Sequence, residues 1–425
     1  MTILIKNGRV VDPSREADGQ EDVLIKNGKI AAVGRIPEEA VSYGKDVRVI
    51  DAQGLTIVPG LMDPHVHFRD PGFTEKEDII TGAAAAKRGG FTRVVCMANT
   101  KPVIDNPQRL RENQRRSEKT GIHVFQDSAV TAGLKGEQLV PMEEMASAGA
   151  PGFTDDGKPL MNEQLLKEAM ERAARLHKPI SLHEEDPLFV NGAGVNQGKI
   201  AALIGYGGAD EAAEYILTAR DCMLALAVGA RICIQHISSA RSVEIVRMAR
   251  KMGADVHAEA TPHHFTLTEE DVLTYGTNAR MNPPLRTQKD RDAIREGLKD
   301  GTIDMIATDH APHTAAEKAR PMPQAPSGII GLETSLGLGI RSLVRPGILT
   351  LRELIYKMST APALFYNMTP ASVREGADAD LTIFGEDEEW KVTDFASKAQ
   401  NSPFSGWILP GRIHYTICGG HIVYE

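Results

Sequence analysis

The sequence predicts an α/β protein, in which a (β/α)8 barrel of the TIM type carries a small β-sandwich domain formed from both termini. Three observations predict this class. Short apolar runs alternate with amphipathic stretches through the middle of the chain. Both ends are rich in β-forming residues separated by Asn-Gly or glycine turns. Polar side chains follow many of the apolar runs, where a parallel barrel collects its functional residues.

The two ends of the chain are predicted to form strands. The sequence IKNG occurs at 5–8 and again at 25–28, and its Asn-Gly pairs between β-rich runs predict tight hairpins. We therefore expect residues 1–59 and 366–425 to form one composite β domain. Further strands are expected near the C-terminus at 379–384, 412–417 and 421–424.

The middle of the chain, residues 60–365, is predicted to form the barrel. Its amphipathic stretches include 162–177, where the apolar residues Leu166, Ala169 and Met170 share one helical face. Strands that alternate with helices favour a parallel sheet, and eight such units in about 300 residues suit a closed barrel. The expected strands are 56–63, 92–98, 123–129, 151–154, 178–182, 231–235, 254–260 and 303–307.

Composition excludes several classes of protein. The chain has 425 residues with 42% hydrophobic and 25% charged residues, which is typical of a folded protein. Its 48 basic and 57 acidic residues give a net charge of −9, and no basic run favours nucleic-acid binding. No apolar stretch approaches the ~18 residues of a membrane span. The four cysteines form no CxxC pair and the N-terminus lacks a secretory signal, so we expect a cytoplasmic protein.

Histidine and carboxylate side chains follow several expected strands. His65 and His67 flank a single residue on an extended strand, so both imidazoles can face one cation. His183, His236 and Asp309 follow three further strands. Because the carboxyl ends of barrel strands converge on one mouth, these side chains form one candidate metal group.

This group contains more ligands than one tetrahedral ion requires. A bridging carboxylate from Asp155 or Asp156, after the fourth strand, would complete a two-metal centre, which can share a hydroxide and polarise a carbonyl. Imidazole with carboxylate favours Zn²⁺, although Co²⁺, Mn²⁺ or Fe²⁺ accept similar ligands. The expected chemistry is hydrolysis without redox.

Three further features lie near the expected mouth. Arg69 can grip a substrate carboxylate through two parallel hydrogen bonds, and its alternative is a salt bridge to Asp70. His263 and His264 are interpreted as packing or supporting groups, because the ligand count is already met. The polar, proline-containing segment 314–324 is expected to be a mobile loop, which is either a lid or a solvated connection.

A set of motifs makes the comparison with a known family possible. These motifs are DPHVHFRDPG at 63–72, MANTKP at 97–102, GFTDDG at 152–157, SLHEED at 181–186, QHIS at 235–238, MNPPLR at 281–286, ATDHAPH at 307–313, GADADLTIF at 376–384 and NSPFSGWILPGR at 401–412. Together they resemble the dihydroorotases of the amidohydrolase superfamily, in particular the long bacterial, or type I, class. The likeness covers essentially the whole chain.

The resemblance implies how the metals are held. His65, His67 and Asp309 would bind the first metal, and His183 with His236 would bind the second. Asp156 would bridge the two, which leaves Asp155 as a capping or turn residue. Many relatives such as hydantoinases use a carboxylated lysine as the bridge. Here the only nearby lysine is Lys158, beyond a glycine, which favours the aspartate-bridged type.

The resemblance also implies a substrate site. Arg69 and Asn99 would hold the substrate carboxylate, and backbone at 327–328 would close over the ring. The full expected set of substrate contacts is His67, Arg69, Asn99, Asn282, His313, Ser327 and Gly328.

The resemblance implies reversible interconversion of L-dihydroorotate and N-carbamoyl-L-aspartate in de novo pyrimidine (UMP) biosynthesis. A hydroxide bridging two Zn²⁺ ions per subunit would attack the ring amide carbonyl. Asp309 would take the hydroxide's proton and return it to the leaving ring nitrogen.

Two other functions stay open at this point. A different cyclic amidohydrolase, such as an allantoinase or a dihydropyrimidinase (hydantoinase), would share the metal ligands but would not need the carboxylate grip of Arg69 and Asn99. A non-catalytic partner of aspartate transcarbamoylase would be expected to lose metal ligands, and all are present here. A homodimer and an association of the active enzyme with aspartate transcarbamoylase are also compatible with the resemblance.

Overall fold

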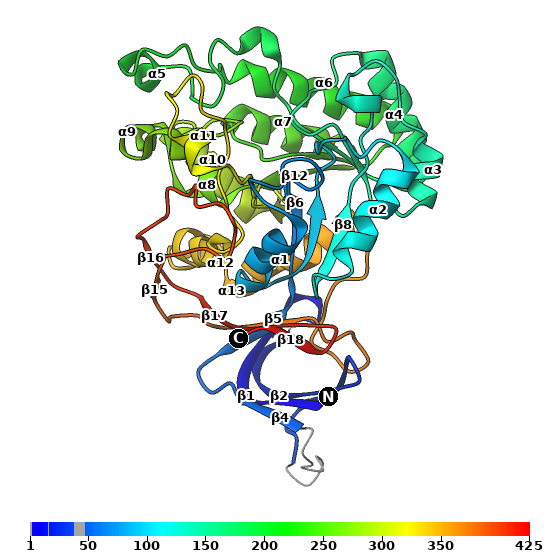
Figure 1. The fold of residues 1–425 in the computed structure, drawn as a ribbon, viewed down its shortest axis with the longest axis vertical. Coiled ribbons are helices and arrows are strands. Elements are labelled where there is room, and N and C mark those ends of the chain that lie inside the picture. Colours follow the sequence, from blue (N-terminus) through cyan, green and yellow to red (C-terminus); the bar gives the residue numbers. More distant parts are fainter. Residues whose placement is uncertain (1, 16, 38–46) are drawn as a thin grey trace.

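The computed structural model describes residues 2–15, 17–37 and 47–425. Figure 1 shows two regions: an α/β region, and a β-rich region at the opposite end of the molecule where both termini lie. Within the described residues, no helix is long and apolar enough to cross a membrane.

Short parallel strands form the centre of the α/β region. Strands β6, β7 and β8 make one sheet, and β9 to β13 make another. A parallel bridge between Ser128 and Phe153 joins the end of β8 to β9, and one between Val66 and His310 joins the segment after β13 to β6. The strands therefore follow one another in a ring, and the predicted fold class is confirmed. Their bounds are β6 (Leu61–Val66), β7 (Phe91–Cys96), β8 (His123–Gln126), β9 (Phe153–Thr154), β10 (Ile180–Leu182), β11 (Ile232–Ile234), β12 (Val256–Ala260) and β13 (Met305–Ile306).

Helices surround this ring (Figure 1). The predicted helix over 162–177 is α4 (Glu163–Arg175), which begins at its N-cap Asn162 and buries Leu166, Ala169 and Met170. The other long helices are α1 (Ile79–Arg88), α2 (Pro107–Ser117), α6 (Ala212–Val228), α7 (Ala240–Lys251) and α10 (Gln288–Asp300). The short ones are α3 (Met142–Ser147), α5 (Lys199–Leu203), α8 (Pro262–Thr266), α9 (Val272–Tyr275), α11 (Ala315–Lys318), α12 (Ser335–Gly339), α13 (Leu351–Ile355) and α14 (Ala361–Phe365).

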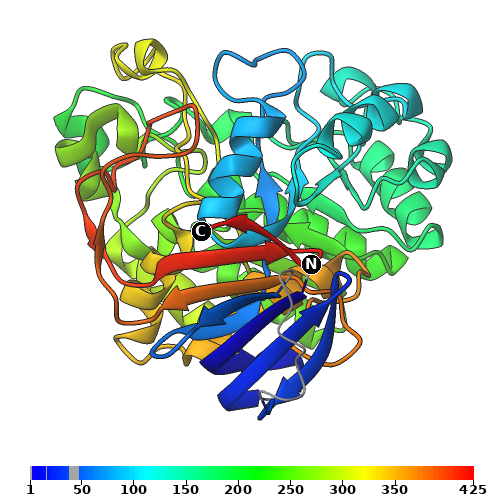
Figure 2. The ribbon, with the colours of Figure 1, turned by 60° about the horizontal axis from the view of Figure 1, so that its bottom comes forward.

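Both ends of the chain build one eight-stranded sheet, which we call the end sheet (Figure 2). Ile3, Ile57 and Leu381 belong to its own apolar core, separate from that of the barrel. The sheet contains β1 (Thr2–Asp12), β2 (Ala17–Lys26), β3 (Lys29–Gly34), β4 (Val47–Asp51), β5 (Thr56–Pro59), β14 (Leu381–Gly385), β17 (Arg412–Cys418) and β18 (His421–Tyr424). A separate pair is formed by β15 (Trp390–Lys391) and β16 (Ile408–Leu409). The predicted domain boundaries stay predictions.

Two expectations about the strands are wrong. The single strand expected over 56–63 is two strands, because β5 pairs with β1 and β14 in the end sheet while β6 begins the barrel. Gly60 lies between them, where a Cβ would be only 2.2 Å from Thr92 Oγ1. Asn7-Gly8 makes no hairpin, because β1 continues through it with a register shift. Asn27-Gly28 does connect β2 and β3 as predicted.

The segment 314–324, which was expected to be a mobile loop, is partly helical. It contains the short helix α11, whose N-cap Thr314 forms a reciprocal capping box with Glu317. Lys318 is buried, and its Nζ donates hydrogen bonds of 3.0 Å to the carbonyls of Pro326 and Gly328. The segment is therefore attached to the wall of the barrel mouth.

Candidate active site

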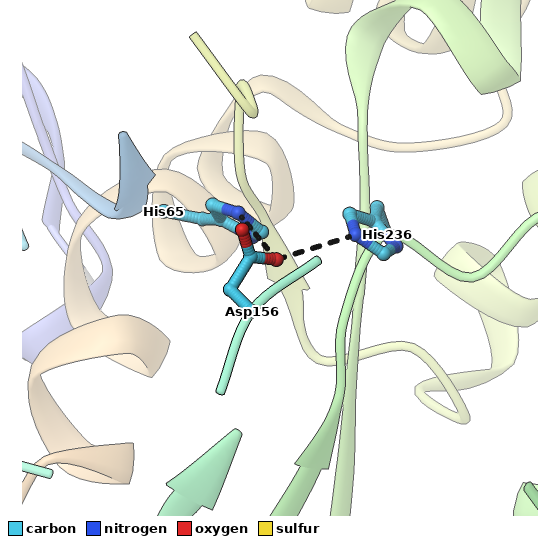
Figure 3. A group of neighbouring side chains, drawn as sticks. All are labelled: His65, Asp156 and His236. Atoms are coloured by element: carbon cyan, nitrogen blue, oxygen red, sulfur yellow. Dashed lines mark ion pairs between the residues drawn. The ribbon is translucent and has the colours of Figure 1, made fainter. Parts of the chain in front are cut away.

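Asp156 is at the centre of a buried group of imidazoles and carboxylates that follow the strands. Figure 3 shows its carboxylate between His65, at the end of β6, and His236, just after β11. Asp156 Oδ1 lies 3.4 Å from His65 Nε2 and 3.8 Å from His236 Nε2. Because these residues come from different strands, the ring of strands is what brings them together.

The first predicted set of ligands is compact. Asp309 Oδ1 lies 3.0 Å from His67 Nε2 and 3.5 Å from His65 Nε2. The other oxygen of Asp156, Oδ2, lies 3.5 Å from His67 Nε2. The imidazoles of His65, in β6, and of His67, just after it, therefore face the same two carboxylates, as alternation along extended backbone requires.

The second predicted pair converges on the same carboxylate from the other side. His183 Nδ1 lies 3.0 Å from His236 Nε2, and both nitrogens are 3.8 Å from Asp156 Oδ1. Asp156 thus contacts both sets, with one carboxylate group between them.

Asp155 points elsewhere. Its carboxylate accepts hydrogen bonds from the backbone amides of Val130 and Thr131, at 2.8 and 3.0 Å, and from the Thr131 hydroxyl. Burial raises the pKa of Asp155 to about 6. This geometry fits the capping role that was the alternative for Asp155 and leaves Asp156 facing the imidazoles.

The donor set fits divalent metal ions. Burial opposes ionisation of Asp156 and Asp309, but the facing histidines hold the pKa of both carboxyls well below the usual range. Three imidazole nitrogens are buried and have no hydrogen-bond partner in the described part of the chain: His65 Nε2, His183 Nε2 and His236 Nδ1. Ionised carboxylates among imidazoles whose buried nitrogens lack partners are the ligand chemistry of Zn²⁺ and related cations.

The backbone is strained at this site. Arg69, His236 and Asp309 have φ values of 58°, 32° and 47° in the left-handed region. Non-glycine residues adopt this region at a cost, and such positions cluster at active sites because the surrounding structure holds a side chain in a required direction.

A cavity of about 150 Å³ opens beside the metal-ligand group. Arg69 lines it, and burial lowers the pKa of this guanidinium. The alternative salt bridge with Asp70 is not formed, because Asp70 pairs with Arg116 at 2.5 Å. Of the described residues, no carboxylate forms a salt bridge with Arg69, whose Nε donates to the Pro312 carbonyl at 3.3 Å. Its terminal nitrogens are therefore available to an anionic ligand.

Two asparagines line the same cavity in different ways. Asn99 connects the two halves of the site, because its Oδ1 lies 3.0 Å from His67 Nδ1 and its Nδ2 donates to Asp156 Oδ2 at 2.9 Å. Asn282 Nδ2 donates to Glu185 Oε2 at 2.8 Å, while its buried Oδ1 has no hydrogen-bond partner within residues 2–15, 17–37 and 47–425. Asn282 therefore offers a free acceptor to a ligand N–H group.

His313 is the one predicted substrate contact outside the cavity lining. Its Nε2 lies 2.8 Å from the Ser327 carbonyl, whereas Ser327 and Gly328 themselves line the cavity. His313 thus supports the 327–328 backbone. Its direct contact with a substrate stays a prediction.

Glu259 is a site residue that the sequence reasoning missed. Its Oε1 lies 2.6 Å from His65 Nδ1, on the side of the ring away from Asp156. A carboxylate in this position fixes the tautomer of a metal-binding histidine. An acidic residue within an expected barrel strand, 254–260, was the available signal.

Replacing Glu259 with glutamine is expected to weaken metal binding by about 10- to 100-fold, because the amide no longer holds the His65 ring as a charged acceptor. Titration of the metal-free protein with Zn²⁺ measures this change. An unaltered affinity would show that His65 is oriented by other contacts.

Two other histidine groups have structural partners. His264 lies in α8, with Nε2 3.0 Å from the carbonyl of Pro283, so it supports the segment that carries Asn282. A separate group of His123, Asp380 and Cys418 could in principle hold a metal, but Arg93 already pairs with Asp380 at 3.1 Å. That group is explained as an ion pair.

A ring of parallel strands with buried imidazoles and carboxylates at one end defines a cyclic amidohydrolase, and solved structures support this class. The chain matches L-hydantoinase (dihydropyrimidinase) from Arthrobacter aurescens with a TM-score of 0.86 and 26% identity, covering 100% of this chain and 96% of that one. Dihydropyrimidinase from Brevibacillus agri shares the fold with a TM-score of 0.84 at 23% identity, covering 100% and 95%.

Sequence comparison identifies the family within this class. A family model described as dihydro-orotase-like matches residues 54–242. Dihydroorotase from Clostridioides difficile is 56% identical over the full length of both chains, and that from Clostridium acetobutylicum is 51% identical over 100% of this chain and 99% of its own. The chain belongs to the dihydroorotase family.

Proposed function

We propose that this enzyme interconverts L-dihydroorotate and N-carbamoyl-L-aspartate, the step that the family performs in pyrimidine biosynthesis. The observation that carries the proposal is the Arg69 guanidinium, which has no carboxylate partner among the residues that the structure describes and lines a small cavity beside Asp156 and Asp309. A ring with a carboxylate substituent satisfies that charge, whereas a neutral hydantoin does not.

Two divalent cations fit the ligand group, and we propose Zn²⁺ for both. His65, His67 and Asp309 would hold one, His183 and His236 the other, with Asp156 between them. When bound, such a pair supplies Lewis-acid activation of a carbonyl and of the attacking water. Co²⁺ or Mn²⁺ are the expected substitutes.

The side chains of the cavity bind the substrate and transfer the proton. Arg69 holds the substrate carboxylate, and the free Oδ1 of Asn282 accepts a hydrogen bond from a ring N–H. Asp309 takes a proton from the attacking water at a carboxylate oxygen and returns it to the leaving ring nitrogen. Asn99 contacts both His67 and Asp156 and so fixes their relative positions. It also lines the cavity in which the substrate carboxylate would bind.

A substrate panel tests this function. The purified enzyme with Zn²⁺ is expected to hydrolyse dihydroorotate and to leave hydantoin and allantoin essentially unchanged. Arg69→Met is expected to lower kcat/KM for dihydroorotate by at least about a hundredfold, because a charge-assisted bidentate contact is lost. Turnover of hydantoin or allantoin with no turnover of dihydroorotate would replace this function with one of the alternatives.

Further proposals concern the setting of the enzyme. We place it in the cytoplasm, where unpaired thiols persist, because all four cysteines are free and buried. A homodimer and an association with aspartate transcarbamoylase stay predictions, which light scattering and co-purification measure.

A further inference from the structure

A segment near the C-terminus reaches the mouth of the barrel. Between β14 and β17 the chain leaves the end sheet, passes beside α12 and extends to the level of α8 (Figure 1). Asn401 lies in this segment and is 4% exposed. The terminal region of the chain therefore contributes a buried polar side chain to the surroundings of the substrate cavity.

Asn401 connects two walls of that cavity. Its Oδ1 accepts a hydrogen bond from the backbone amide of His313, and its Nδ2 donates to the carbonyls of Ala311 and Gly328, each at 3.1 Å. Its own carbonyl accepts from the amide of Ile330 at 3.1 Å. One side chain thus joins the backbone after β13 to the backbone at 328.

The contact reaches Arg69 through a single residue. Asn401 binds both neighbours of Pro312, and the carbonyl of Pro312 accepts the hydrogen bond from Arg69 Nε at 3.3 Å. Fixing the backbone at 311–313 therefore fixes the acceptor that orients the guanidinium. The same residue also holds the Gly328 carbonyl, which Lys318 binds from the other side at 3.0 Å.

Other contacts hold this segment against the barrel, so the backbone that carries Asn401 is fixed in place. The amides of Ala396 and Ser397 donate to the buried carboxylate of Glu333 at 2.9 and 3.1 Å. The amide of Lys398 donates to Glu77 at 3.2 Å, and the Ser397 hydroxyl binds the same carboxylate. These contacts hold the segment without using Asn401.

We propose that Asn401 is a positioning residue for substrate binding: by holding the backbone at 311–313 and at 328, it places Arg69 and the 327–328 wall around the substrate carboxylate. The proposal rests on the proposed function. Asn401 does not line the cavity, so it acts through these two segments. Its loss therefore weakens the binding of the substrate more than the chemical step, which depends on Asp309.

Steady-state kinetics of Asn401→Leu with dihydroorotate test the proposal. Leucine has the same branched arrangement of side-chain heavy atoms but no hydrogen-bonding groups, so the variant is expected to raise KM about 10- to 30-fold with kcat within about threefold of wild type. Bound Zn²⁺, measured on the same protein, is expected to stay unchanged. Asn401→Ala removes the same hydrogen bonds without adding volume, so it is expected to raise KM by a similar factor, and it covers the case in which the leucine variant fails to fold.

Gln400→Leu is the matched control, because Gln400 is exposed and, among the described residues, its side chain hydrogen-bonds only within its own segment, to Ser397 O at 3.2 Å. It is expected to behave as wild type. An unchanged KM in both Asn401 variants, or an equal rise in the control, would overturn the positioning role. Wild-type protein that is inactive on dihydroorotate in the same assay would instead overturn the proposed function, and this proposal with it.

Discussion

Asp309→Asn is expected to lower kcat by about a thousandfold or more while the metal content stays close to that of the wild type. The amide keeps the shape of the side chain and an oxygen that can face His67, but it cannot accept and return a proton. Positioned general acid–base groups contribute about 100- to 10,000-fold to rates. Stopped assays with dihydroorotate and with N-carbamoyl-L-aspartate measure the loss in both directions.

Metal analysis is the control for this variant. Because His65, His67 and Asp156 remain, loss of activity with metal retained separates the proton-transfer role of Asp309 from its role as a ligand. Normal turnover by Asp309→Asn would refute the acid–base assignment. Loss of metal in parallel with activity would assign Asp309 as a ligand alone.

Asp156→Asn is expected to abolish measurable turnover and to release bound metal, because its carboxylate is the group that both sets of imidazoles face. An amide has no charge to balance two divalent cations. Inductively coupled plasma mass spectrometry of the purified variant measures the metal content, and the dihydroorotate assay measures activity.

The adjacent residue supplies the control for that prediction. Asp155→Asn removes a carboxylate that bonds the backbone at 130–131, so it is expected to lower thermal stability while keeping metal and most activity. The opposite pattern, with metal lost from Asp155→Asn and kept in Asp156→Asn, would exchange the two roles.

The part of the site that depends on local sequence patterns could be predicted. His65 and His67 on one strand, and charged residues directly after other strands, indicate convergence as soon as a barrel is expected. The choice between Asp155 and Asp156 depends on which carboxylate turns toward Val130, and no local pattern of an Asp-Asp pair contains that information. Glu259 was missed because its partner His65 lies on another strand.

The difference between local sequence patterns and contacts of distant segments also explains the errors in the fold. An apolar run over 56–63 predicts one strand, but its first half pairs in the end sheet and its second half in the barrel, and these partners are distant in the sequence. Asn7-Gly8 has the composition of a hairpin turn, but β1 also pairs in parallel with β4 and β5, and these distant partners keep it extended. The role of Asn401 had no local signal at all, because its contacts with His313 and Gly328 exist only in the folded chain.

A crystal structure of the Zn²⁺-loaded enzyme with N-carbamoyl-L-aspartate, with anomalous data at the zinc edge, tests the central claim most directly. We predict two anomalous peaks, one among His65, His67 and Asp309 and one beside His183 and His236, with the Asp156 carboxylate contacting both and Arg69 holding a ligand carboxylate. A single peak, Asp155 in place of Asp156, or a ligand carboxylate away from Arg69 would contradict it.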